Sequence, residues 1–265
     1  MMNYNKLRRI LNENAPSTAT RLSSTWPFYT ESVGVTGNFD YIEFMAEYAP
    51  FSQADLENLA RAAELYEMGT MIKVDFQNRG YVAQRAVGAG FQAINFTDHH
   101  NAGEVAETVK IMKPDTVEDG GRFGYPNRRF IGCKPTVDQF THIERLREVV
   151  LCFMIEKKSA VEDIEAICSV PGVDMIQFGP SDFAMSSGWQ AGEHSDEIKA
   201  AERRCIEVAL RHGVQPRCEI NTVDAAKYYI DLGVRHFCLG DQTRMLNLFW
   251  RGEGSKMRAA ADELR

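Results

Sequence analysis

Apolar runs alternate along the chain with longer segments in which apolar residues recur every three or four positions. Short runs rich in β-branched and aromatic residues are typical of buried strands, and the longer periodic segments are typical of amphipathic helices. Eight strands are predicted in this way, at residues 18–24, 41–47, 70–76, 91–96, 149–156, 174–179, 215–220 and 235–240.

A helical segment is expected after each strand. The clearest of these segments lie at residues 52–69, 79–88, 101–112, 159–168, 194–212 and 222–232, with a further one after residue 240. Ser52 is expected to cap the first of them and Gly69 to stop it, because Ser favours helix starts and Gly favours helix ends.

Strands that are separated by helices predict a parallel sheet with right-handed crossovers. Eight such units in 265 residues fit one closed (β/α)8 TIM barrel, a single domain over residues 1–265, better than an open doubly wound sheet. No G-x-G-x-x-G follows any predicted strand, which weakens a dinucleotide-binding interpretation. Residues 113–148 look irregular, and so long a loop is typical of a lid, a binding loop or an interface.

Composition narrows the classes of function. The formal net charge is −7 and the chain has no lysine- or arginine-rich run, so nucleic acid is not expected as a partner. The apolar stretches are too short for a membrane span, and the N-terminus lacks the apolar core of a signal peptide. The six cysteines show no metal-type spacing and are expected to be reduced, buried thiols. These features predict a cytoplasmic protein.

Ligands of parallel barrels bind at the carboxyl ends of the strands. Glu156 and Asp182 follow consecutive predicted strands, and neighbouring strands lie about 4.8 Å apart. Two carboxylates held in this way can share one divalent ion and leave its other positions to water and substrate. In the alternative interpretation, Asp182 only caps a helix, and Glu156 pairs with Lys157 or Lys158.

The turn before Asp182 has the features of an anion site. Gly179 permits close approach of the backbone, and Pro180 fixes the turn. Ser181 and Asp182 then begin a short helix, whose first N–H groups are free to hold an anion.

The segment 149–188 resembles the signature of the class II, metal-dependent pyruvate aldolases, the HpcH/HpaI aldolase and citrate lyase β-subunit family. The matching pieces are Ile-Glu at a strand end, Val-Pro-Gly-Val-Asp, and Gly-Pro-Ser-Asp followed by a short helix with Ser-x-Gly. A looser similarity continues across most of the chain.

The resemblance implies a pyruvate-binding TIM barrel that acts as a carbon–carbon lyase on a 2-oxo acid through a metal-stabilised enolate. Glu156 and Asp182 would hold Mg²⁺, Mn²⁺ or Co²⁺, and the backbone around Gly179, Ser181 and Asp182 would receive the carboxylate of the substrate. The resemblance also implies a homo-oligomer, a hexamer or trimer of dimers, with the C-terminal helix exchanged between subunits. The apolar residues around Trp250 agree with burial of this segment against another subunit.

Departures from the family pattern bear on the reaction. Where the family has Asp-Gly-Glu-His on the second strand, this chain has Met45-Ala46-Glu47-Tyr48, so the acid/base Asp and His are replaced. Lys73 stands where the family places a substrate-binding Arg, and Met154 stands where Gln is common. A lysine offers a point charge instead of a planar fork. Glu47, Tyr48 and Lys73 are therefore the candidate catalytic residues.

Several interpretations of these departures stay open. A lyase could share proton transfer among Tyr48, Lys73 and metal-bound water, with the pKa of the Tyr48 phenol lowered by a nearby cation. The enolate could instead serve decarboxylation, hydrolysis or condensation, or the protein could bind metal and 2-oxo acid without turnover. A metal-free Schiff base would need a lowered pKa at Lys73. Tyr48 could also only pack against Phe51.

Further charged residues lie near strand ends. Arg21 is a candidate for binding a second carboxylate or phosphate of the substrate, or else forms a surface or interface pair. Glu43 and Glu47 lie on the same side of one strand. Glu47 could orient metal-bound water, and Glu43 would need a partner such as Lys73 or Arg21. Arg122 lies in a loop that resembles one shaping the family's site or subunit contact.

Overall fold

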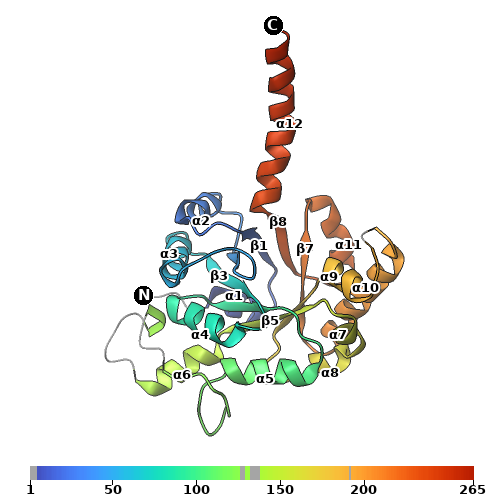
Figure 1. The fold of residues 1–265 in the computed structure, drawn as a ribbon. Coiled ribbons are helices and arrows are strands. Elements are labelled where there is room, and N and C mark those ends of the chain that lie inside the picture. Colours follow the sequence, from blue (N-terminus) through green and yellow to red (C-terminus); the bar gives the residue numbers. More distant parts are fainter. Residues whose placement is uncertain (1–4, 126–128, 132–137, 191) are drawn as a thin grey trace.

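The computed structural model describes residues 5–125, 129–131, 138–190 and 192–265. Eight parallel strands form a closed barrel in chain order, and β8 pairs with β1 to complete it (Figure 1). Parallel neighbours in chain order are what helical crossovers of one hand produce. The predicted (β/α)8 fold is confirmed.

The strands lie within two residues of their predicted bounds. They are β1 (Ser17–Leu22), β2 (Tyr41–Met45), β3 (Gly69–Val74), β4 (Ala93–Phe96), β5 (Val150–Ile155), β6 (Met175–Phe178), β7 (Gln215–Ile220) and β8 (His236–Asp241). Strands of a parallel barrel are buried on both faces, so they leave continuous apolar runs that the sequence shows directly.

The helices form an outer layer around the barrel (Figure 1). They are α1 (Lys6–Asn12), α2 (Pro27–Gly34), α3 (Gln53–Glu64), α4 (Arg79–Ala89), α5 (Ala102–Met112), α6 (Gln139–Arg147), α7 (Lys158–Glu162), α8 (Ile164–Cys168), α9 (Pro180–Ser186), α10 (Ser195–Arg211), α11 (Ala226–Asp231) and α12 (Gln242–Asp262), with short 3-10 turns at Arg129–Ile131 and Val223–Ala225.

Helix α3 begins as predicted but ends earlier. Ser52 caps it in a reciprocal arrangement with Asp55. The prediction that Gly69 stops this helix is wrong, because α3 ends at Glu64 and Gly69 is the first residue of β3. Glu67, with φ of 54°, makes the left-handed turn in its place.

Residues 113–148 are not irregular throughout. Helix α6 occupies residues 139–147, and Asp138 caps it by accepting a hydrogen bond from the Thr141 N–H. The predicted lid or binding loop also includes residues 126–128 and 132–137, which lie outside the described residues.

The lower part of the barrel interior is apolar. Inward-facing side chains recur at every second residue of a strand, as the pleat requires. One buried cluster contains Leu7, Ala19, Tyr41, Met71, Ala93, Val150, Cys152, Met175 and Cys238. Leu7 comes from α1, so this helix contributes to the apolar end of the barrel. A larger cluster fills the space between the strands and the surrounding helices.

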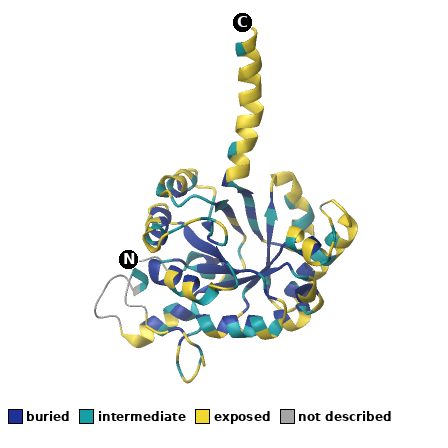
Figure 2. Cartoon of the chain, in the orientation of Figure 1, coloured by how far each residue is buried: buried dark blue, intermediate teal, exposed yellow. Residues whose placement is uncertain are grey.

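Helix α12 differs from the other helices in its surroundings. It projects from the barrel, and nearly all of its length is exposed (Figures 1 and 2). Leu248, Phe249 and Trp250 are 58%, 64% and 60% exposed, which is unusual for large apolar side chains lying close together.

Two expectations from composition can be compared with the structure. Five cysteines are buried free thiols, as predicted, and the sixth, Cys133, lies outside the described residues. Among the described helices, none has both the length and the apolar character that a bilayer crossing requires.

Candidate active site

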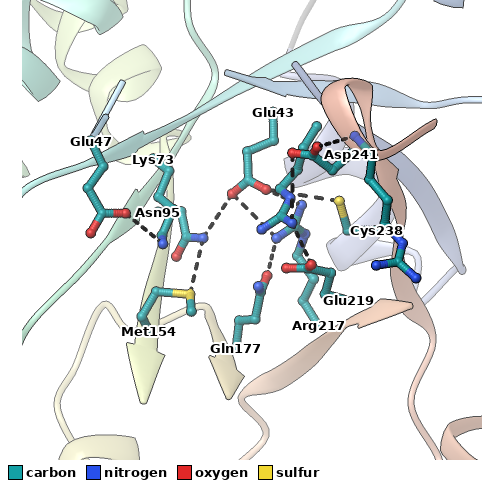
Figure 3. A network of polar contacts seen from close by, with 12 residues as sticks. Glu43, Glu47, Lys73, Asn95, Met154, Gln177, Arg217, Glu219, Cys238 and Asp241 are labelled. Carbon is teal, nitrogen blue, oxygen red and sulfur yellow. Dashed lines mark hydrogen bonds and ion pairs between the residues drawn. The ribbon is translucent and has the colours of Figure 1, made fainter. Parts of the chain in front are cut away.

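Two residues beyond the apolar cluster, toward the carboxyl ends of the strands, the barrel interior becomes polar. The side chains of this region form a network of hydrogen bonds and ion pairs that spans the barrel (Figure 3). Its labelled members are Glu43, Glu47, Lys73, Asn95, Met154, Gln177, Arg217, Glu219, Cys238 and Asp241.

The deepest charges of the network belong to Glu43 and Arg217, both without exposed side-chain surface. Arg217 Nη2 donates to Glu43 Oε2 at 2.9 Å, and Arg217 Nε donates to the Tyr41 hydroxyl at 2.8 Å. Gln177 accepts from Arg217, and Asn95 Nδ2 donates to Glu43 Oε1 at 2.8 Å. Burial alone would raise the pKa of Glu43, but Arg217 and the hydrogen bonds lower it, so both partners stay charged.

This pair corrects the prediction for Glu43, whose expected partners were Lys73 or Arg21. The partner is Arg217 on β7, across the barrel from β2. Arg217 was not singled out in the sequence. Its one signal is a charged residue within the predicted strand 215–220, two positions before Glu219.

Lys73 and Glu47 form a second ion pair nearer the strand ends. Lys73 Nζ lies 2.6 Å from Glu47 Oε2, and the two side chains are 9% and 6% exposed. Burial acts to lower the pKa of Lys73, but the carboxylates of Glu156 and Glu47 outweigh it and raise the pKa. A Schiff base needs a neutral amine and hence a lowered pKa at Lys73. The pKa is raised instead, so the prediction of a Schiff base at Lys73 is wrong.

Glu156 follows β5 and is 2% exposed. Its Oε1 accepts a hydrogen bond from the Asp98 N–H at 2.9 Å. Gly179 lies against its other side, where an added Cβ would come within 2.8 Å of Glu156 Oε2. The close approach expected of Gly179 is thus present, and no larger residue fits without a shift. Burial raises the pKa of Glu156 to about 7, with Lys73 acting in the opposite direction.

Asp98, two residues beyond the end of β4, is a site residue to which no role was assigned from the sequence. It has a left-handed backbone with φ of 60°, which is uncommon for a residue other than Gly. This conformation accompanies the N–H contact with Glu156, and Asp98 Oδ1 lies 2.5 Å from Lys157 Nζ. Lys157 therefore pairs with Asp98, contrary to the alternative in which Glu156 and Lys157 pair. The Lys158 N–H bonds to Ser186.

Asp182 lies in the first turn of α9 and is half-buried, next to the exposed Ser181. The N-cap of α9 is Gly179, which has no side chain to cap the helix. The alternative role of Asp182 as the N-cap is therefore not observed. Its charge contributes to the raised pKa of Glu156, so the two carboxylates lie within electrostatic reach of one another.

The charges around Glu156 and Asp182 do not balance. These two carboxylates lie with those of Glu47 and Asp98 and with the ammonium groups of Lys73 and Lys157, which leaves two negative charges if all are ionised. The group therefore contains four carboxylates and two ammonium groups. One divalent cation would neutralise the excess, and hard oxygen ligands suit Mg²⁺ or Mn²⁺.

A metal here would rest on few protein ligands. Within the described residues, no three His, Cys, Asp or Glu side chains are arranged to hold an ion. Two carboxylates, Glu156 and Asp182, nevertheless suit Mg²⁺, which commonly keeps water and substrate oxygens in its other positions. The buried Glu156, with its raised pKa, and the excess of negative charge therefore fit the predicted metal.

Tyr48 is less embedded than expected. It is 76% exposed, and Lys73 Nζ lies 6.0 Å from the centre of its ring. Partial burial and the carboxylates of Glu47, Asp182 and Asp98 raise the pKa of the Tyr48 phenol. The predicted lowering by a nearby cation is wrong, because these negative charges oppose ionisation more than Lys73 favours it.

Two further arginines have partners of their own. Arg21 Nη2 lies 2.5 Å from Glu219 Oε1 and 4.0 Å from Asp241 Oδ2, at the mouth of the barrel. Arg122 Nη2 pairs with Glu107 at 3.0 Å, and both side chains are well exposed. Arg122 therefore forms a surface pair in the single chain.

Comparison with known proteins adds to this geometry. A 5-keto-4-deoxy-D-glucarate aldolase of Klebsiella pneumoniae is 25% identical over 81% of this chain and 81% of its own. A hydroxypyruvate/pyruvate aldolase of Paraburkholderia phytofirmans is 23% identical over 89% and 90%. The aldolase names of these relatives confirm the predicted lyase class.

Solved structures share the fold. Macrophomate synthase superposes with a TM-score of 0.86 at 20% identity, covering 100% of this chain and 93% of its own. The citrate lyase β subunit of M. tuberculosis, solved with oxaloacetate and magnesium, has a TM-score of 0.59 at 10% identity, with 88% and 94% covered. The family model for HpcH/HpaI aldolase/citrate lyase matches residues 35–229, and the chain belongs to this family.

Proposed function

We propose that this protein cleaves and forms a carbon–carbon bond next to the keto group of a 2-oxo acid, with pyruvate as the product of cleavage. The observation that carries the proposal is a charged lysine beside an excess of carboxylates at the strand ends, on the same side as Glu156 and Asp182. Such a site supplies both a cation for developing negative charge and ligands for a divalent metal.

Glu156 and Asp182 would hold the metal, which we propose to be Mg²⁺, Mn²⁺ or Co²⁺. When bound, it would supply Lewis-acid stabilisation of negative charge on the keto oxygen. The N–H groups of Ser181 and Asp182 in the first turn of α9 would orient the substrate carboxylate, and Gly179, whose own N–H bonds to the Ile155 carbonyl, would allow it to come close. The related citrate lyase subunit, solved with magnesium and a 2-oxo acid, supports this choice of ligand.

Lys73 and Glu47 would handle charge and protons. In cleavage, the bond between C3 and C4 breaks, the C4 hydroxyl loses its proton, and the electron pair moves into the enolate of pyruvate. We assign Glu47 as the acceptor of that proton, because its carboxylate lies beside Lys73 near the strand ends, where the reacting carbons would be held, and is nearly shielded from water. Lys73 stays protonated and lies ready to stabilise the enolate oxygen. C3 of the enolate then takes up a proton to give pyruvate.

Exchange of the pyruvate methyl protons with D₂O tests this assignment without an aldehyde. Protein loaded with Mn²⁺ should exchange them, and Lys73→Met should slow exchange about a hundredfold or more. Lys73→Arg, which keeps the charge, should retain much of the rate. Equal rates in Lys73→Met and the parent would remove Lys73 from the mechanism. Exchange without any aldol reaction would indicate other enolate chemistry, such as decarboxylation or condensation.

Assembly through α12 is part of the proposal. The exposed apolar side chains Met245, Leu248, Phe249 and Trp250 favour packing against another subunit, in a hexamer or trimer of dimers. Truncation after Gly240 should give smaller species or aggregates in light scattering, whereas an unchanged oligomer would contradict this. A cytoplasmic location accords with the five buried free thiols.

A further inference from the structure

We propose that Arg21, Glu219 and Asp241, here called the distal cluster, bind the part of the substrate that becomes the aldehyde, and that this part is uncharged and hydroxylated. The inference rests on the proposed aldolase function and names its substrate class. Four observations support it: the place of the cluster on the barrel, its exposure, its charge and its hydrogen-bonding capacity.

Arg21 of the distal cluster lies on the strand opposite the one that Glu156 follows, and Asp241 and Glu219 lie on the next two strands around the barrel. Arg21 lies on β1, Glu219 on β7 and Asp241 at the end of β8, which are consecutive strands of the closed barrel. Strand β1 is four strands away from β5, the strand of Glu156, in either direction around the barrel. A 2-oxo acid anchored near Glu156 would therefore direct its remaining carbons toward this cluster.

Charge effects connect the two sides of the mouth. Burial raises the pKa of Glu219, and the cations that counter it are Arg21, Arg217 and Lys73. The carboxylate of Glu219 thus lies within electrostatic reach of the lysine that we place beside the enolate. One substrate of a few carbons could contact both residues.

The distal cluster is accessible, unlike the pair beneath it. The side chains of Arg21, Glu219 and Asp241 are 17%, 28% and 24% exposed. Glu43 and Arg217 have no exposed side-chain surface. A ligand in the mouth can therefore touch the distal cluster and cannot touch the buried pair.

The charge of the distal cluster disfavours an anionic substrate end. The guanidinium of Arg21 is neutralised by Glu219 at 2.5 Å, and Asp241 adds a second carboxylate at 4.0 Å. One cation and two anions leave a negative charge, which would repel a carboxylate or phosphate. The expectation that Arg21 binds a second acidic group is therefore not favoured by its surroundings.

Hydroxyl groups match the hydrogen-bonding capacity of the distal cluster. Asp241 Oδ1 caps α12 by accepting from the Arg244 N–H, and Glu219 Oε1 accepts from Arg21. Each carboxylate has further lone pairs that can accept from substrate hydroxyls. Arg21 Nε is buried and makes no hydrogen bond with the described residues. A preference for an uncharged, hydroxylated substrate end would distinguish this chain from the relative named for 5-keto-4-deoxy-D-glucarate, a compound with two carboxylates.

The test compares two aldehydes that differ in a single group. In the aldol direction, C3 of the enolate bonds to the aldehyde carbon, and the aldehyde oxygen takes up the proton that C3 has lost. With Mn²⁺ and pyruvate, the parent should use glycolaldehyde with a kcat/KM at least about tenfold above that for glyoxylate. The first aldehyde carries a hydroxymethyl group where the second carries a carboxylate.

Variants then assign this preference to the distal cluster. Glu219→Gln removes one of the two carboxylates beside Arg21, which makes the distal cluster neutral, and should shift the preference toward glyoxylate by about tenfold, chiefly through KM for the aldehyde. Asp241→Asn, which can still cap α12, should shift it in the same direction. The matched control is Glu197→Gln, which replaces an exposed carboxylate in the first turn of α10. It should leave kcat/KM unchanged for both aldehydes.

Pyruvate exchange in D₂O separates this inference from the proposed function. Exchange should persist in Glu219→Gln, which shows that the fold and the enolate chemistry are intact. A parent enzyme that prefers glyoxylate, or a Glu219→Gln variant with the preference of the parent, would overturn the inference while exchange stands. Absence of exchange in the parent would overturn the proposed function and this inference with it.

Discussion

Two polar layers lie one above the other in the barrel, and they differ in balance. The buried layer consists of Glu43 and Arg217 with the neutral side chains that bond to them, and its two charges cancel. The mouth layer contains Glu47, Lys73 and Glu156 with Asp98, Asp182 and Lys157, and carboxylates exceed ammonium groups there.

The comparison shows that polarity inside a barrel does not by itself mark a site. The two charges of the buried layer are paired with one another and have no exposed surface, so we assign this layer a structural role. The mouth layer keeps an excess of negative charge near the strand ends, where ligands enter. Unbalanced charge together with access distinguishes the functional layer. Variants that perturb one layer at a time test this distinction.

The largest effect is expected from breaking the buried layer. Arg217→Met leaves the carboxylate of Glu43 buried without its cation, which typically costs about 3–5 kcal/mol of unfolding free energy. Urea denaturation measures the loss. Lys227→Met, which breaks an exposed ion pair with Asp231 on α11, serves as the control and should cost less than about 1 kcal/mol. Similar losses in the two variants would contradict the distinction between buried and exposed pairs.

Lowering the pH should destabilise the folded protein through His236, which lies near Arg217. This side chain bonds to Ser17 at 2.9 Å, and burial together with the nearby Arg217 lowers the pKa of His236 to about 4. Between pH 6.5 and pH 4 the unfolded chain binds the proton and the folded chain does not, so stability is lost as the pH falls through this range. The contribution is about 3 kcal/mol.

Replacing His236 should flatten that pH dependence. His236→Gln cannot titrate, so its unfolding free energy should fall less between pH 6.5 and pH 4 than that of the parent. The exposed His100 offers the matched control, His100→Gln, which should keep the slope of the parent. A slope unaltered by His236→Gln would remove this residue from the acid response.

A smaller loss of stability is expected when Gly179, which lies against Glu156 of the mouth layer, is enlarged. In Gly179→Ala the new methyl group would lie 2.7 Å from Glu156 Cβ and 2.8 Å from its Oε2, so the carboxylate must move. Overpacking of this kind costs about 1–3 kcal/mol. Mn²⁺ affinity should fall at the same time, whereas Gly252→Ala, at a position of α12 with open space around it, should leave the affinity unchanged. Unaltered Mn²⁺ binding in Gly179→Ala would contradict the place given to Glu156.

The smallest effect is expected at Tyr48. Partial burial and the neighbouring carboxylates raise the pKa of its phenol, so it stays protonated and is a poor base near neutral pH. Tyr48→Phe should therefore lower the rate of pyruvate exchange less than about tenfold, without moving its pH profile. A loss of a hundredfold would restore Tyr48 to the mechanism and would weaken the assignment of Glu47.

The fold and part of the site could be predicted from the sequence. Buried parallel strands are continuous apolar runs, so their order and bounds were visible. Glu156 and Asp182 could be found because strand ends carry the ligands of such barrels and because their motifs resemble a family. Gly179 followed from its place between them.

The remaining features depend on three-dimensional arrangement. Arg217 pairs with Glu43 across the barrel, and strand order and register decide which residues meet there. Asp98 acts through its backbone N–H in a left-handed conformation, which its residue type does not reveal. The pKa of Tyr48 depends on partial burial and on three carboxylates from different segments, so the direction of its shift could not be inferred from Lys73 alone.

The most direct test of the central claim is the affinity of the mouth layer for Mn²⁺. Calorimetric titration of Glu156→Gln beside the parent should show binding about tenfold or more weaker, because one of two anionic ligands is lost. Asp182→Asn should behave alike, and both variants should unfold cooperatively as the parent does. Mn²⁺ bound equally well by the parent and both variants would contradict the account.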